Sequence, residues 1–206
     1  MYKIKFTLFF YVFLSFSFIG KSAYAANDNI NSLANSYANL VSHYYNEVSL
    51  STQEMHNAII KFVQAPDNNS LANAKNKWIA ARSIYGITEA FRFYGGPIDG
   101  VNKYGEEGPE GLINAWPLNE AYIDYVKGSP NAGIINNLTL EINNRTIIAA
   151  NMSEDDADVS SGWHAIEFLL WGQDFSLETT GMREASDYLP TNEINIRRRA
   201  YLVATS

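Results

Sequence analysis

Residues 162–174 read GWHAIEFLLWGQD, and this stretch does most to decide both the expected fold and the expected site. Between residues 162 and 171, every residue other than His164 and Glu167 is apolar or glycine. Residues three apart lie on one face of an α-helix, so the imidazole and the carboxylate should be neighbours on a largely buried helix. Aimed at one point, such groups can ligate a metal ion or act as an acid and base pair.

Helical patterns occupy most of the chain outside this stretch. From residue 28 to about 64, apolar residues recur in steps of three and four, which predicts an amphipathic helix that either runs through or restarts at Ser51. A second helix is expected from about 71 to 94, before Gly95-Gly96-Pro97. Weaker patterns cover 131–136 and 139–150, and another helix begins at Asn192. No segment alternates long enough to propose a sheet, so the predicted class is all-α.

The segment from Pro97 to Pro130 differs from these helical stretches. Glycine and proline recur in it between large aromatic residues such as Tyr104, Trp116 and Tyr122. A long connection that carries its own large apolar groups is more often an ordered loop than a disordered linker. We therefore expect it to fold back onto the helices.

The first residues indicate the compartment. Lys3 and Lys5 precede an apolar run at 6–19, and Ala23-Tyr24-Ala25 supplies a small-x-small cleavage site, so residues 1–25 are predicted to be a secretory signal peptide. The run is shorter than the ~20 residues that span a bilayer, and no transmembrane helix is expected after cleavage. The mature protein should cross the inner membrane into the periplasm or cell envelope.

Composition limits the remaining possibilities. The chain has no cysteine, which excludes disulfides, thiolate ligands and thiol nucleophiles, and its net charge of −7 disfavours nucleic acid as a partner. Residues 26–206 have room for one domain with a sizeable core. The chain ends at Ser206 inside a helical pattern without a C-cap, so we expect a domain truncated at its C-terminus.

The second predicted helix carries an unusual stripe of polar residues. The members share steps of three and four residues and are Trp78, Arg82, Tyr85, Glu89 and Arg92. The aromatic members indicate that the stripe is buried, where a carboxylate must be neutralised by an arginine or a bound cation. Glu89 is thus either part of an Arg-Glu-Arg ladder that orients the helix or part of a functional site.

The pair His164 and Glu167 also allows two interpretations. A core histidine hydrogen-bonded to the carboxylate three residues on is common, and two ligands are an incomplete set for zinc or iron. The spacing alone therefore does not establish a metal site.

The motif Gly162-x-His164-x-x-Glu167, with its continuation to Asp174, resembles the GxHxxE signature of the imelysin family, which includes iron-regulated proteins. Residues 78–93 and 96–100 resemble an earlier block of that family, and 115–118 and 198–202 fit as well. The resemblance implies an all-helical, imelysin-like bundle protein of the cell envelope that is linked to iron acquisition. Since the family usually has two bundle halves, this chain resembles one half.

The resemblance also implies a metal site. His164 and Glu167 would bind iron or zinc together with two carboxylates of the earlier block, Glu89 and Asp99, and an envelope iron-transport component would be a partner. A metallopeptidase label accompanies the family, but HxxE offers one histidine where HExxH offers two. Metal binding without proteolysis is therefore the first interpretation, a metal-dependent peptidase the second, and a structural envelope protein the third.

Overall fold

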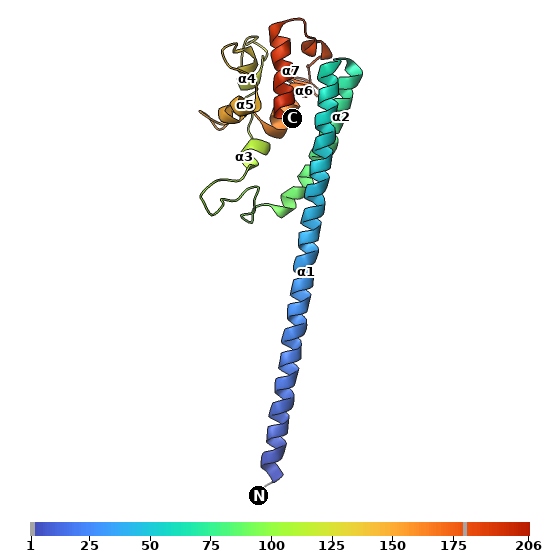
Figure 1. The fold of residues 1–206 in the computed structure, drawn as a ribbon, viewed down its shortest axis with the longest axis vertical. Helices are drawn as coiled ribbons and strands as arrows, with labels where there is room; N and C mark the ends of the chain where they lie inside the picture. The colour runs from blue at the N-terminus through green and yellow to red at the C-terminus, as the bar shows by residue number, and fades with distance from the viewer. Residues whose placement is uncertain (1–2, 179–180) are drawn as a thin grey trace. The chain divides into compact units, whose positions relative to one another are not determined.

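The computed structural model describes residues 3–178 and 181–206, with side chains from residue 29 onward. In this part of the chain the regular structure is helical (Figure 1), and extended pairing is limited to two isolated bridges, Val101 with Glu107 and Val126 with Ser129. The predicted all-α class is confirmed.

Two compact units divide the chain, residues 1–43 and residues 44–206. Helix α1 (Lys3–Gln64) supplies the first unit and continues into the second without a restart at Ser51. The signal peptide predicted for residues 1–25 falls on residues whose side chains lie outside the described part, and it stays a prediction. Among the residues whose placement is described, no helix is both long enough and apolar enough to cross a membrane.

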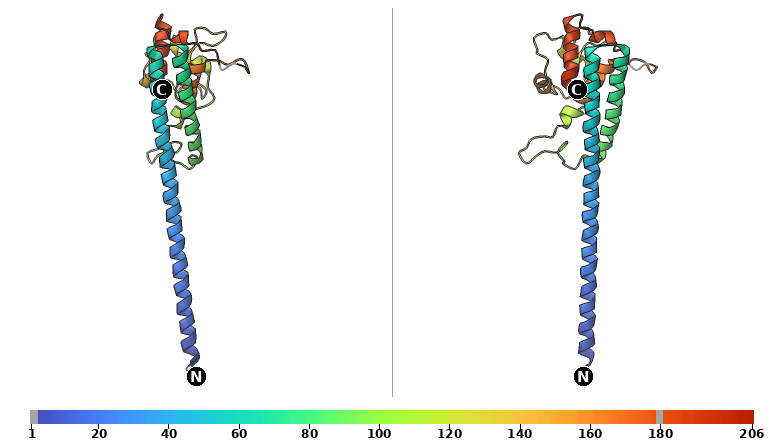
Figure 2. Two further views of the ribbon diagram at one scale, coloured as in Figure 1. Left: turned by 90° about the vertical axis from the view of Figure 1, so that its right-hand side faces the viewer. Right: turned by 45° about the vertical axis from the view of Figure 1, so that its right-hand side comes forward.

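Helix α2 (Asn68–Ile87) runs back alongside the part of α1 that belongs to the second unit (Figures 1 and 2). Its start is fixed by Asp67, whose carboxylate accepts a hydrogen bond from the Ser70 amide in a reciprocal capping box. It ends at Ile87, before the predicted residue 94, and the buried Thr88 hydroxyl donates to the Tyr85 carbonyl at 2.6 Å. A 3-10 turn, η1 (Thr88–Phe91), follows.

The remaining elements are short until α6. The predicted ordered excursion after Pro97 contains α3 (Glu110–Ile113) and α4 (Glu120–Ile123). The weak patterns at 131–150 correspond to the 3-10 turn η2 (Ile134–Asn136) and α5 (Asn144–Ala150). Next come α6 (Gly162–Trp171), the 3-10 turn η3 (Ala185–Tyr188), and α7 (Glu193–Thr205), which begins near its predicted start and is capped by Asn192.

Helix α6 lies in the centre of the core. Its buried residues are Trp163, Ala165, Ile166, Phe168, Leu169 and Leu170. The indole nitrogen of Trp78 in α2 donates to the Trp163 carbonyl at 3.1 Å, and Tyr201 in α7 donates to the carbonyl of Ser160 at 2.8 Å. Neighbouring helices therefore hold α6 by hydrogen bonds at its start as well as by apolar contacts.

A buried ion-pair network joins the end of α4 to α7 and to the segment before η3. The Asp124 side chain is 0% exposed and accepts hydrogen bonds from Nε and Nη2 of Arg198 at 2.6 and 3.1 Å. Arg183, also buried, places Nη1 3.0 Å from the same carboxylate and its guanidinium over the Tyr125 ring. Asp124 thus pairs with two buried arginines and ties three distant segments together, and Arg183 also lies 3.5 Å from Oδ2 of Asp187.

Candidate functional site

The start of α6 is fixed by Gly162. Its φ of 84° lies in the left-handed region that glycine tolerates, and a Cβ there would lie less than 3.0 Å from the Ile113 carbonyl. The hydroxyl of Ser161 donates to the Leu112 carbonyl at 2.8 Å. The end of α3 therefore packs directly against the first turn of α6, beside His164.

His164 and Glu167 form the predicted neighbouring pair on α6. Nδ1 of His164 lies 3.3 Å from Oε2 of Glu167, and the two side chains are 18% and 45% exposed. The Trp116 ring covers the imidazole with its centroid 4.8 Å away. When Nδ1 carries the proton it donates to Glu167, and Nε2 is left as an acceptor or ligand.

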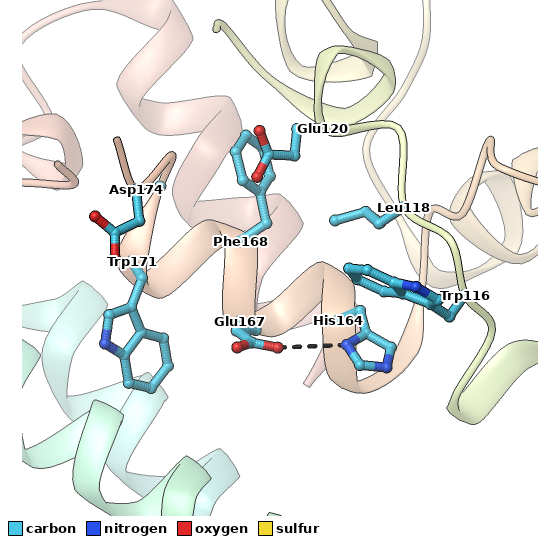
Figure 3. Close-up of a pocket in the computed structure, with 9 residues that line it drawn as sticks. Trp116, Leu118, Glu120, His164, Glu167, Phe168, Trp171 and Asp174 are labelled. Atoms are coloured by element: carbon cyan, nitrogen blue, oxygen red, sulfur yellow. Dashed lines mark hydrogen bonds and ion pairs between the residues drawn. The ribbon is translucent and has the colours of Figure 1, made fainter. Parts of the chain in front are cut away.

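The pair faces a pocket of about 440 Å³ (Figure 3). The lining residues come from the 116–120 segment, from α6 and from the chain just after it; they are Trp116, Leu118, Glu120, His164, Glu167, Phe168, Trp171, Gly172 and Asp174. Sequence reasoning missed Glu120, which lies in an irregular region without periodicity. Asp174 lies at the end of the signature stretch, and no helical spacing assigned it a role.

Glu120 is held at the pocket by the chain that follows α6. Its Oε2 accepts a hydrogen bond from Nε2 of Gln173 at 2.7 Å, and the Gln173 amide oxygen accepts one from the Lys127 backbone at 2.7 Å. Gln173 therefore joins the α4 region to the end of α6. The Glu120 carboxylate is oriented here by a neutral amide, and this contact adds no positive charge to the pocket.

The pocket is electrostatically negative. Three carboxylates line it, and neither Glu120 nor Glu167 lies within ion-pairing distance of a lysine or arginine in the described chain. A cleft lined by one sign of charge attracts ligands of the other sign. The arrangement therefore suits a cation.

Comparison with protein families gives one match. The family model described as Imelysin (Peptidase_M75) matches residues 41–206. The chain belongs to the imelysin family. No curated protein matches this sequence. The matched range includes the whole pocket and all four predicted metal ligands, so each can be located in an imelysin domain.

The structure of this imelysin keeps Glu89 and Asp99 away from the pocket lining. Glu89 lies in η1 with its side chain 49% exposed, and its Oε1 is 3.4 Å from Nη2 of Arg92. The Asp99 carboxylate accepts a hydrogen bond from the backbone of Phe93. Their role as ligands stays a prediction.

The pocket provides suitable atoms for a metal ion but few of them. In the described part of the chain, no group of three or more His, Asp or Glu residues is arranged to hold one ion. The expected convergence of Glu89, Asp99, His164 and Glu167 is therefore absent from this structure. The imidazole and the carboxylate of α6 fit iron or zinc chemically, and further ligands must come from water, another molecule or side-chain movement.

The predicted polar stripe is only partly buried, since Trp78, Tyr85 and Arg92 are buried whereas Glu89 is exposed, and its pairing differs from the expected ladder. Arg92 forms its closest ion pair with Glu110 of α3 and also donates to the Tyr85 hydroxyl at 3.1 Å. Burial opposes its charge, yet the hydrogen bond to Glu110 and the nearby negative groups raise the pKa of Arg92. Arg82 instead stacks on the rings of Tyr85 and Trp163 and does not contact Glu89. The sequence could not show Glu110 as the partner because it lies in the irregular segment.

Replacing Arg92 by methionine should destabilise the domain by about 2 kcal/mol, because Glu110 and Tyr85 each lose a charged hydrogen-bond partner. Chemical denaturation measures the change. The matched control is Arg145→Met, since Arg145 is exposed and has no ion pair in the described structure. Equal midpoints for both variants would show that the Arg92 cluster contributes no stability.

Proposed function

We propose that this imelysin binds a metal ion in the pocket beside α6, with iron as the first candidate and zinc as the second. His164 and Glu167 are the proposed protein ligands. The observation that carries the proposal is the position of this pair in a pocket whose described lining includes three carboxylates and neither lysine nor arginine. Mixed nitrogen and oxygen donors suit both metals.

Glu89 and Asp99 enter the proposal through the family resemblance alone. Each has a partner on its own segment, so joining the metal would require the 88–100 region to move. The binding experiment therefore includes Glu89→Gln and Asp99→Asn as separate variants. Unchanged metal affinity in both would remove them from the ligand set.

Export to the cell envelope is the second part of the proposal. It rests on the predicted signal peptide, and a mature N-terminus at Ala26 in the periplasmic fraction would support it. The family resemblance adds delivery of iron to an envelope transport component to this proposal. Iron uptake by cells that is unaffected by His164→Ala would contradict a role in iron acquisition.

Metal-dependent proteolysis is a second candidate, because the family model carries the peptidase label. The pocket supplies one histidine on α6, fewer than the two of HExxH enzymes. Peptide hydrolysis that is lost with a chelator and restored by zinc would favour this candidate. Metal binding without turnover would favour the binding protein.

The deciding experiment is a calorimetric titration of metal-free protein with Fe²⁺ and with Zn²⁺. We expect one ion per chain, and a loss of affinity of about 100-fold or more in His164→Ala, since a direct ligand should matter at least as much as the groups that orient it. His43→Ala is the control, because this histidine does not line the pocket. Equal affinity in wild type and His164→Ala would leave the pair as a structural hydrogen bond.

A further inference from the structure

The pocket extends well beyond the His164–Glu167 pair. Figure 3 shows His164 and Trp116 on one side of it and Trp171 with Asp174 on the other, with Phe168 and Glu120 between. The part away from the imidazole therefore combines two aromatic side chains with two carboxylates. None of these four groups is a proposed ligand of the metal ion.

The separation of the carboxylates favours a cation that is larger than a metal ion. A bare metal requires donor atoms that converge on one point, and no such group of three exists among the described residues. Around a cavity of about 440 Å³, separated carboxylates with aromatic walls between them instead match an organic cation. Its charge can be shared by several carboxylates while its methyl or methylene groups contact the rings.

The Trp171 ring takes part in a cation–π contact with a residue outside the pocket lining. Nζ of Lys75 lies 5.4 Å from the centroid of the Trp171 ring, so this indole already makes a cation–π contact within the fold. Lys75 does not line the pocket. Glu120, held by Gln173, presents a second fixed negative charge nearby.

We propose that this part of the pocket binds a small organic ammonium ligand, with Glu120 and Asp174 supplying the counter-charge and Trp171 the aromatic contact. The ligand class is a primary or quaternary amine with a short apolar body. Binding of this kind requires no metal, so the inference goes beyond the proposed metal site and stands separately from it.

The test uses choline as the probe and 3,3-dimethylbutan-1-ol as its uncharged isostere, both titrated in the presence of EDTA. Binding is followed by tryptophan fluorescence and by calorimetry. We expect choline to bind at least about tenfold more tightly than the isostere, because only the charged probe gains the cation–π and carboxylate interactions. No choline binding, or equal affinity for the two probes, would overturn the inference.

Substitutions of single carboxylates test whether choline binds at this part of the pocket. Glu120→Gln and Asp174→Asn should each weaken choline binding several-fold, whereas Glu154→Gln removes one exposed carboxylate outside the pocket and should leave it unchanged. Equal losses of choline affinity in all three variants would show that only the net charge of the protein matters, and would overturn the proposed site. Choline binding in EDTA by a chain that binds neither iron nor zinc would support this inference and end the metal proposal. Metal binding without choline binding would support the metal proposal and overturn this inference.

Discussion

Asp124→Asn should lower the free energy of unfolding by about 3–5 kcal/mol, the range for a buried ion pair that loses one partner. The substitution keeps the shape of the side chain but removes the charge that pairs with Arg198 and Arg183, both buried beside it, and leaves Arg183 with Asp187 at 3.5 Å. Neither arginine can lose its proton, so each guanidinium would remain charged and poorly compensated. For a domain of this size, the melting temperature should fall by about 10 °C.

The matched control is Asp156→Asn, which makes the same chemical change at an exposed position without a hydrogen bond or ion pair in the described structure. It should shift the melting temperature very little. In a double-mutant cycle, Asp124→Asn combined with Arg198→Met should cost less than the sum of the single changes, because the second removes a charge that the first leaves unpaired. Strict additivity would mean that the contact contributes no coupling energy.

Periodicity predicted the long helices of this imelysin, including the part of α1 where the apolar residues Ile30, Leu33 and Tyr37 are exposed. Their ends were less predictable: α7 begins beside Asn192 as expected, whereas α2 gives way to a 3-10 turn at Thr88, earlier than the Gly95-Gly96-Pro97 signal indicated. A glycine-proline cluster marks where a helix cannot continue. It does not show whether the α-helix ends several residues earlier, as α2 does.

The candidate site was only partly predictable for a related reason. His164 and Glu167 share a helix, so their spacing in the chain determines their relative position in space. Glu120 and Trp116 reach the same pocket from an irregular segment, where no period relates sequence distance to spatial distance. Asp124 was missed in the same way, since a lone carboxylate in a loop shows no sign of two arginines that follow far along the chain.

The ligand assignment that rests on the family resemblance stays a prediction. Glu89 and Asp99 were placed at the metal because they belong to a block that resembles the family's earlier motif. In the structure this block serves packing: Trp78 and Tyr85 enter the core, and Arg92 bonds to α3. A motif can recur in a family because it holds the fold, so resemblance alone does not separate ligands from scaffold.

Gly162→Ala should destabilise the domain by at least about 2 kcal/mol and disturb the pocket. Two effects combine: alanine is strained at a φ of 84°, and its Cβ would overlap the backbone carbonyl of Ile113. The carbonyl belongs to the chain itself and cannot rotate away as a flexible side chain would. Separation of α3 from α6 is the expected relief, and it would move Trp116 relative to His164.

Two other glycines separate these contributions. Gly105→Ala introduces the same positive-φ strain, at 83°, but its Cβ meets nothing within 4 Å, so about 1–2 kcal/mol of strain should be its whole effect. Gly86→Ala lies inside α2 with open space around it, and alanine should stabilise that helix by roughly 0.5–1 kcal/mol. Urea denaturation of the three variants should therefore give a stabilised, a mildly destabilised and a strongly destabilised protein. If Gly162→Ala were no worse than Gly105→Ala, the close packing of α3 on α6 would not constrain the GxHxxE motif, and its glycine would need another explanation.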